Sequence, residues 1–228
     1  MKAAEPVLSS NEVRAILWKH GLPVSDQNWD RLEQWVSLLE TFNRQVNLVS
    51  RSDIPRIWGR HLLPSLLLPV FRDIPEESRI CDFGSGGGFP GMPLAICRPD
   101  LQVTMLDARQ KKTRIIDQMI EKLSLRNAFT LQGRGEVLGG SMVGPERFPV
   151  LSARAVASLD RLDRWTRNLR ADESKLHVFK GGNLDEEIRK LQKGCPGIEW
   201  EQTPLDIPEF PYLAENRKCL VTLNFHSG

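Results

Sequence analysis

The segment Cys81-Asp-Phe-Gly-Ser-Gly-Gly-Gly-Phe-Pro-Gly91 follows an apolar run that begins at Arg79. An apolar run that ends in glycines is typical of a strand that stops at a tight turn. Gly84, Gly86 and Gly88 alternate, and glycine permits positive φ and lets a ligand approach the backbone closely. Residues 92–97 then have helical character. Because ligands bind beyond the carboxyl ends of strands in doubly wound sheets, this turn is predicted to be a binding site.

Two classes of cofactor fit this turn. Residues 86–91 match GxGxxG, the dinucleotide fingerprint. Residues 84–88 match GxGxG, and Asp82 stands two residues before them. This acidic lead-in resembles the first motif of class I S-adenosylmethionine-dependent methyltransferases, in which the carboxylate helps to hold the amino-acid part of the cofactor. A carboxylate would repel a pyrophosphate, so methyl transfer is favoured over nicotinamide or flavin binding.

Asp107 ends the next predicted strand, residues 101–107. It lies about 20 residues beyond the glycine turn, where an acid commonly bonds a ribose hydroxyl. Both cofactor classes contain that ribose. Asp107 therefore supports an adenosine ligand without choosing between them.

Strands and helices alternate from residue 79 onward. Such alternation implies right-handed crossovers and a mostly parallel sheet. The predicted fold class is α/β, a Rossmann-like class I methyltransferase sheet whose last strand is antiparallel because the chain closes with a hairpin. Residues 139–145 are expected to be a mobile loop. The predicted strands cover 79–83, 101–107, 128–132, 148–153, 175–180, 198–202 and 218–225, and the predicted helices 92–97, 111–123, 159–169 and 183–191.

Residues 1–78 are predicted to form a helical extension, which leaves 79–228 as the methyltransferase domain. Apolar residues recur at helical spacing from Leu32 to Val46, after the possible N-caps Ser25 and Asp26. A shorter helix precedes this one, around residues 13–18. A third is expected to begin after residue 53.

The composition limits the location of the protein and its partners. The chain has 228 residues and a net charge of +2, enough for one domain with an appendage. The longest apolar stretch, residues 62–70, is interrupted by Pro64 and Pro69, whereas a membrane span needs about 20 apolar residues. Residues 1–11 lack the apolar core of a secretory signal. We therefore expect a cytoplasmic protein without membrane contact. The four cysteines form no CxxC pair, so no metal is expected.

One stretch is markedly basic. Residues 109–126 hold six Lys or Arg against Asp117 and Glu121. This stretch could contact the phosphates of a nucleic acid or could be an ordinary solvated helix face. The basic candidates for RNA contact are Lys111, Lys112, Arg114 and Lys180, and His61 is a further candidate that could equally be a hydrogen-bonding core residue.

The segment after the fourth predicted strand restricts the choice of substrate. Residues 151–157 contain neither the Asn/Asp-Pro-Pro-aromatic motif of amino-group methyltransferases nor the cysteine of cytosine-C5 enzymes. A substrate atom that is already nucleophilic fits best. Guanine N7 carries a free lone pair, so no general base is expected and no catalytic residue is predicted.

Several segments resemble the RsmG family, also called glucose-inhibited division protein B, from about Trp29 to the C-terminus. Pro64 and Pro149 depart from the family pattern, which usually has Asp at the first position and tends to have Asp at the second. The matching segments are 47–49, 60–65, 82–95, 106–114, 133–136, 153–155 and 179–181.

The resemblance implies a guanine-N7 methyltransferase of 16S ribosomal RNA that acts in the 530 loop. The expected partner is the 16S RNA or the small ribosomal subunit, and the expected oligomeric state is a monomer. Two alternatives remain open: a non-catalytic assembly factor that keeps the cofactor fold, and a methyltransferase for a small molecule or a protein. With the residues of the glycine turn, the expected S-adenosylmethionine site comprises Asp82, Gly84, Gly86, Phe89, Asp107, Gly135, Glu136 and Arg154.

Overall fold

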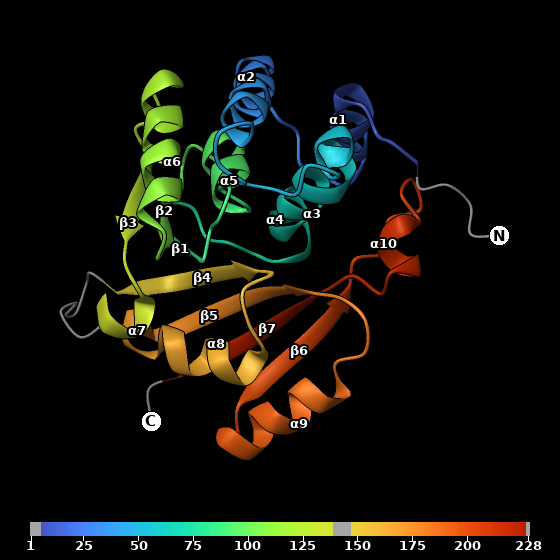
Figure 1. The fold of residues 1–228 in the computed structure, drawn as a ribbon. Coiled ribbons are helices and arrows are strands. Elements are labelled where there is room, and N and C mark those ends of the chain that lie inside the picture. Colours follow the sequence, from blue (N-terminus) through green and yellow to red (C-terminus); the bar gives the residue numbers. More distant parts are fainter. Residues whose placement is uncertain (1–5, 139–146, 227–228) are drawn as a thin grey trace.

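The computed structural model describes residues 6–138 and 147–226, and the loop expected at 139–145 lies outside these ranges. Seven strands form a single sheet in the order β3-β2-β1-β4-β5-β7-β6 (Figure 1). The strands are β1 (Arg79–Phe83), β2 (Gln102–Asp107), β3 (Ala128–Gln132), β4 (Phe148–Arg154), β5 (Arg170–Lys180), β6 (Glu199–Pro204) and β7 (Cys219–Phe225).

The directions of the strands confirm the predicted topology. Strands β1 to β5 pair with one another in parallel. Strand β7 runs antiparallel to both β5 and β6, so the chain closes with the predicted hairpin. Because β7 lies between β5 and β6, strand β6 returns to the common direction at the edge of the sheet.

Helices cover both faces of the sheet (Figure 1). The helical N-terminal region lies on the same face as the helices that follow β1 and β2, and one hydrophobic cluster joins Trp35 and Leu39 of that region to Met92 and Met105. A second cluster fills the opposite face. The first face carries α1 (Ser10–Lys19), α2 (Asp26–Asn43), α5 (Gly91–Cys97) and α6 (Gln110–Lys122), and the second carries α7 (Gly135–Leu138), α8 (Leu159–Thr166) and α9 (Asp185–Gly194).

The division into an extension, 1–78, and a domain, 79–228, stays a prediction. The apolar packing crosses residue 78 without interruption, since Trp35 meets Phe89 edge to face with ring centroids 4.9 Å apart. Within the described residues, every helix is too short or too polar to span a membrane.

Local chemistry explains where the first helices begin and end. Ser9 caps α1 in a capping box with Glu12, and the Ser25 hydroxyl accepts the Asn28 N–H at the start of α2. Helix α2 ends at Asn43, three residues before the end of its apolar stripe. There the Asn43 side chain accepts N–H groups of the following turn, which draws the chain out of the helix.

The third predicted helix is instead four short pieces. Pro64 and Pro69 cannot donate backbone hydrogen bonds, so a continuous α-helix cannot pass through this segment. The pieces are a 3-10 turn η1 (Ile54–Arg56), a π-helical turn η2 (Trp58–Leu62), α3 (Leu63–Leu66) and α4 (Leu68–Phe71).

Other differences from the predicted elements also have local causes. Strand β5 begins at Arg170, five residues before its predicted start, because its first part is polar and carries no apolar pattern. The guanidinium of Arg170 pairs with buried Asp163. Pro149 lies at a register shift in the β4–β5 pairing, which is where a strand tolerates a missing N–H. The four-residue helices α7 and α10 (Tyr212–Glu215) are too short to show a period.

Candidate active site

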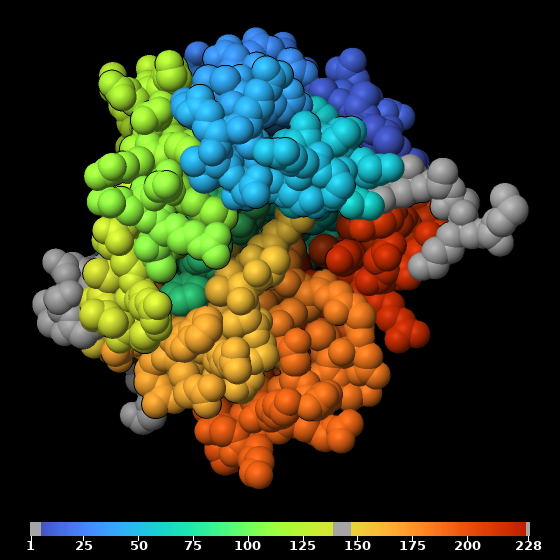
Figure 2. All heavy atoms as spheres, in the orientation of Figure 1, coloured from blue at the N-terminus to red at the C-terminus, as the bar shows by residue number. Residues whose placement is uncertain are grey.

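A cavity of about 620 Å³ opens beyond the carboxyl ends of β1, β2 and β4. In Figure 2 the surface is hollowed between the blue and cyan N-terminal segments and the gold segment that follows β4. The walls include seven of the eight residues predicted for the cofactor: Gly84, Gly86, Phe89, Asp107, Gly135, Glu136 and Arg154.

The glycine turn forms one wall with its backbone. Gly84 has φ +70° and Gly86 φ +58°, a conformation that favours glycine. The N–H groups of Gly84 and Ser85 both bond to the Leu106 carbonyl, which fastens the turn to β2. A Cβ on Gly84 would lie 2.7 Å from a methyl of Val156, so the two loops touch only because no side chain stands there.

Asp107 connects β2 to this turn. Its carboxylate accepts the Gly86 N–H at 2.9 Å and the Arg109 N–H at 2.8 Å. Each carboxylate oxygen can accept more than one hydrogen bond, and the residue lines the cavity. Asp107 is therefore in position to accept hydroxyl groups of a ribose.

Asp82 lies beneath the turn instead of in the cavity wall. It is fully buried, and its carboxylate accepts the Gly91 N–H at 2.9 Å and the Ser152 hydroxyl at 3.3 Å. Burial raises the pKa of Asp82 to about 7, although the hydrogen bonds from Gly91 and Ser152 oppose this rise. In this structure Asp82 supports the backbone that forms the site.

Gly135 and Glu136 begin α7 on the opposite side of the cavity. A Cβ on Gly135 would lie 2.2 Å from the Phe83 ring, so only glycine allows α7 to pack this closely. Glu136 is exposed at the rim of the cavity.

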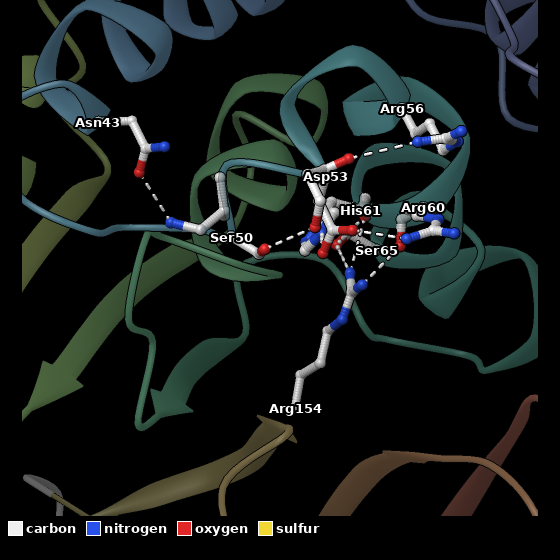
Figure 3. A network of polar contacts seen from close by, with 10 residues as sticks. Asn43, Ser50, Asp53, Arg56, Arg60, His61, Ser65 and Arg154 are labelled. Atoms are coloured by element: carbon white, nitrogen blue, oxygen red, sulfur yellow. Dashed lines mark hydrogen bonds and ion pairs between the residues drawn. The ribbon is translucent and has the colours of Figure 1, made fainter.

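Arg154 ends β4 and reaches into the N-terminal region (Figure 3). It donates to the carbonyl oxygens of His61 at 2.9 Å and Arg60 at 2.5 Å, and its guanidinium lies 5.9 Å from the centre of the Phe89 ring. Burial lowers the pKa of Arg154 to about 10, which still leaves it charged at neutral pH. Arg154 thus joins the sheet to the N-terminal region beside the cavity.

His61 stands close to Arg154 and forms part of the same wall. Its Nε2 lies 3.1 Å from a carboxylate oxygen of Asp53, and its ring centre lies 5.1 Å from that of Phe89. Burial, followed by the charge of Arg154, lowers the pKa of His61 to about 4. The contact with Asp53 agrees with the hydrogen-bonding core role given as the alternative, and a contact of His61 with RNA stays a prediction.

The basic candidates for RNA contact are dispersed. Lys111 and Arg114 are exposed on α6. Lys112 lines the cavity, where burial lowers its pKa. Lys180 donates to the Ala157 carbonyl at 2.8 Å and pairs with Glu187 at 2.6 Å, so its charge is largely used within the protein.

Some lining residues were not predicted for the site. Leu48 and Val49 close the cavity from the N-terminal region, and their N–H groups bond to the buried Asn43 side chain at 2.8 and 3.0 Å. Residues 47–49 match the family pattern, but the sequence assigns no role to them. The other unpredicted lining residues include Ser85, Ala108, Arg109, Ala155, Val156 and Trp165.

The cavity suits the predicted cofactor. Its volume lies within the range of small-molecule sites. Leu48, Val49 and Val156 offer apolar surface for an adenine, and Asp107 offers acceptors for a ribose. The Ser85 hydroxyl is buried and has no hydrogen-bond partner among the described residues, so a polar ligand group could satisfy it. Asp107, Glu136 and the backbone of the glycine turn are the groups that would hold the cofactor.

The sheet order, the glycine turn and the acid that ends β2 define the class I S-adenosylmethionine-dependent methyltransferase fold. The YcgJ protein of Bacillus subtilis has this fold with a TM-score of 0.53 at 11% identity, over 72% of this chain and 98% of that protein. The [4+2]-cyclase SpnF superposes with a TM-score of 0.55 at 15% identity, over 73% of this chain and 81% of SpnF. Likeness at such low identity concerns the fold and leaves the reaction open.

Sequence similarity identifies the family. The family profile described as rRNA small subunit methyltransferase G matches residues 28–205. Proteins named ribosomal RNA small subunit methyltransferase G are 34% identical in Chlorobium phaeobacteroides, over 88% of this chain and 87% of that protein, and 39% identical in Halorhodospira halophila, over 84% and 86%. The chain belongs to the rRNA small subunit methyltransferase G family, which confirms the predicted resemblance.

Proposed function

We propose that this protein transfers a methyl group from S-adenosylmethionine to N7 of a guanine in the 530 loop of 16S ribosomal RNA. The observation that carries the proposal is the match to the family along most of both chains, together with an intact cavity at the glycine turn. The small ribosomal subunit or its RNA is the partner, and we expect the reaction to occur in the cytoplasm. The oligomeric state, expected to be a monomer, stays a prediction.

The cofactor, when bound, supplies an electrophilic methyl group on a positively charged sulfur. The residues of this chain hold and orient it. Asp107 accepts hydrogen bonds from the ribose hydroxyls of the cofactor. Glu136 and the glycine turn contact the other parts of the cofactor. Asp82 contributes through the turn, because it fixes the Gly91 N–H. Phe89 and Arg154 line the cavity on the side of the N-terminal region.

The transfer needs no general base, since the guanine N7 lone pair lies in the plane of the ring. His61 is consistent with a reaction that needs no base. Its low pKa keeps the imidazole neutral, and its contact with Asp53 fixes the ring in the cavity wall. The protein accelerates the reaction mainly by alignment, an effect that is large when two reactants are held in the reacting geometry. Loss of a single polar group should reduce the rate through misplacement instead of abolishing a proton transfer.

Helix α6 provides the positive surface for RNA in this proposal. Lys111 and Arg114 are exposed on it. Neutralising one phosphate contact lowers the salt slope of binding by about 1 and weakens binding evenly across sequences. The Lys111→Gln variant should show this effect, and an unchanged slope would remove Lys111 from the RNA surface.

The decisive experiment is transfer of a labelled methyl group to small-subunit RNA, followed by chain cleavage at N7-methylguanine. We expect one cleavage site, in the 530 loop. Naked RNA and whole subunits are tested in parallel. If the label appears on a protein or a small molecule instead, the protein is a methyltransferase for that other substrate. Calorimetry with S-adenosylhomocysteine tests whether the protein is a non-catalytic assembly factor, since such a factor need not bind the cofactor.

A further inference from the structure

A second cavity of about 360 Å³ lies next to the first. The two cavities share His61, Arg154 and Ala155 as lining residues, so their contents would be neighbours. The second cavity lies at the carboxyl ends of β4 and β5, where ligands of such sheets bind. Its outer wall comes from Tyr212 of α10 and from Lys218, which directly precedes β7.

The walls of this second cavity combine aromatic and apolar residues with charged ones, among them the carboxylate of Asp53. Phe179 and Leu213 line it but are almost fully buried, so the half-buried Tyr212 offers the accessible aromatic ring. Pro64 lines the cavity from the N-terminal region. The Arg60 guanidinium lies 5.5 Å from the centre of the Tyr212 ring and holds that ring in place. A flat heterocycle fits such walls, because aromatic rings and guanidinium groups stack on nucleobases.

Lys218 differs from the other basic residues of this cavity. Arg154 is held by two carbonyl oxygens, and Lys180 by Glu187 and Ala157. The Lys218 ammonium has no ion pair or hydrogen bond among the described residues, and the residue is half-buried. An ammonium group without a partner in the protein is available to an anion such as a phosphate.

Gly181 makes room for this lysine. A Cβ at Gly181 would lie 3.1 Å from Lys218 Cδ and 3.3 Å from its Nζ. The lysine stem therefore lies directly over the bare backbone after β5. This placement keeps the ammonium at the cavity wall.

We propose that the second cavity receives a single purine nucleotide of the substrate, with its base against the Tyr212 ring and its phosphate at Lys218. The inference rests on the proposed function and adds a site to it. An enzyme that modifies a base inside folded RNA must take that base out of its stack and hold it in a pocket. Because His61, Arg154 and Ala155 line both cavities, such a base would lie next to the cofactor.

The chain offers a selective probe, because Tyr212 is its single tyrosine. Protein labelled with fluorotyrosine gives one fluorine NMR signal, which reports on the second cavity. The signal is followed during titration with guanosine 5′-monophosphate, with S-adenosylhomocysteine present to fill the first cavity. We expect a saturable shift in the millimolar range, with a smaller effect from guanosine, which lacks the phosphate, and from uridine 5′-monophosphate, which lacks the purine.

Variants of the lysine and its neighbour complete the test. Lys218→Met should weaken the binding of guanosine 5′-monophosphate about fivefold, as expected for loss of one ion pair of about 1 kcal/mol. Gly181→Ala should weaken it too, since it displaces the lysine without removing the charge. The control is Lys193→Met, which changes the same charge on the exposed end of α9 and should leave binding unchanged.

Methyl transfer provides the second readout. Lys218→Met should raise KM for the RNA severalfold while the affinity for S-adenosylhomocysteine stays the same. A fluorine signal that does not move with guanosine 5′-monophosphate, or equal behaviour of the Lys218 and Lys193 variants, overturns the proposal. Failure of the proposed function is seen separately, as absence of S-adenosylhomocysteine binding or of methyl transfer by the unaltered protein.

Discussion

Arg154 donates a hydrogen bond to the Arg60 carbonyl oxygen at 2.5 Å. In a regular α-helix that carbonyl would accept the N–H of residue 64. Pro64 has no N–H, and the chain forms a π-helical turn at residues 58–62. The proline thus leaves a carbonyl to which a side chain from the end of β4 can bond, and this contact joins the N-terminal region to the sheet (Figure 3).

Loss of the Arg154 contacts should destabilise the protein. Arg154→Gln removes hydrogen bonds to two carbonyl oxygens, and hydrogen bonds from charged groups contribute roughly 1.5–3 kcal/mol each. Because the surrounding groups partly relax, we expect the free energy of unfolding in urea to fall by about 2–4 kcal/mol. S-adenosylhomocysteine should also bind more weakly. The control Arg164→Gln, at an exposed ion pair with Asp160, should cost less than about 1 kcal/mol.

Pro64 and Arg154 should be energetically coupled. Pro64→Ala restores an N–H that competes with Arg154 for the Arg60 carbonyl. The change should therefore weaken S-adenosylhomocysteine binding in the unaltered protein and have little effect in an Arg154→Gln background. A double-mutant cycle should give a coupling energy of roughly 0.5–3 kcal/mol. Pro69→Ala, at the other proline of this segment, should be additive with Arg154→Gln. Additivity at Pro64 as well would refute the proposed role of the proline.

Much of the fold could be predicted from periodicity and glycine placement. The bounds of β1 and β3 agree with the prediction, and those of β2 and α5 agree within one residue. For β1 and β2 the reason is that buried parallel strands are short continuous apolar runs. The segment at 54–71 could not be predicted in this way. Its apolar pattern suits one helix, while the breaks arise from missing proline N–H groups and from a contact with Arg154, which is distant in sequence.

The same contrast holds for the site. The glycine turn, Asp107 and Gly135 were predicted, and the structure brings them together around one cavity. The position of Asp82 beneath the turn was not predicted. The strand pattern does not show whether a carboxylate near the end of β1 points into the cavity or lies beneath the turn. Leu48 and Val49 line the cavity because Asn43 holds the turn that contains them. Such a contact leaves no periodic pattern in the sequence from which it could be predicted.

Asn43 should control the cavity wall from a distance. Its side-chain oxygen accepts the N–H groups of Leu48 and Val49, and all three residues are buried. Asn43→Ala leaves two buried donors without a partner, at a cost of roughly 1–3 kcal/mol each. We expect lower stability and weaker S-adenosylhomocysteine binding. The control Gln45→Ala, at an exposed position two residues away, should change neither property. Normal binding by Asn43→Ala would show that the turn is held by its apolar contacts alone.

The buried carboxyl of Asp82 should give stability a distinctive pH dependence. Burial raises the pKa of Asp82 to about 7 in the folded protein, above its usual value near 4. The folded state then binds a proton that the unfolded state releases, so the contribution of Asp82 to stability is fully present below pH 4 and is lost as pH rises to about 7. His61 and His177 act in the opposite sense, because burial lowers their pKa values to about 4 and about 3, and stability falls as pH drops below 6.5.

Asp82→Asn isolates this contribution. Relative to the unaltered protein, the variant should gain stability as pH rises from 5 to 7, by about 1 kcal/mol per pH unit. Urea unfolding at several pH values measures the difference directly. Ser152→Ala supplies a second comparison, since the Ser152 hydroxyl bonds to Asp82 and lowers its pKa. Without that bond the pKa of Asp82 rises further, and the loss of stability should extend to higher pH. A difference between Asp82→Asn and the unaltered protein that does not vary with pH would mean that Asp82 is ionised throughout this range.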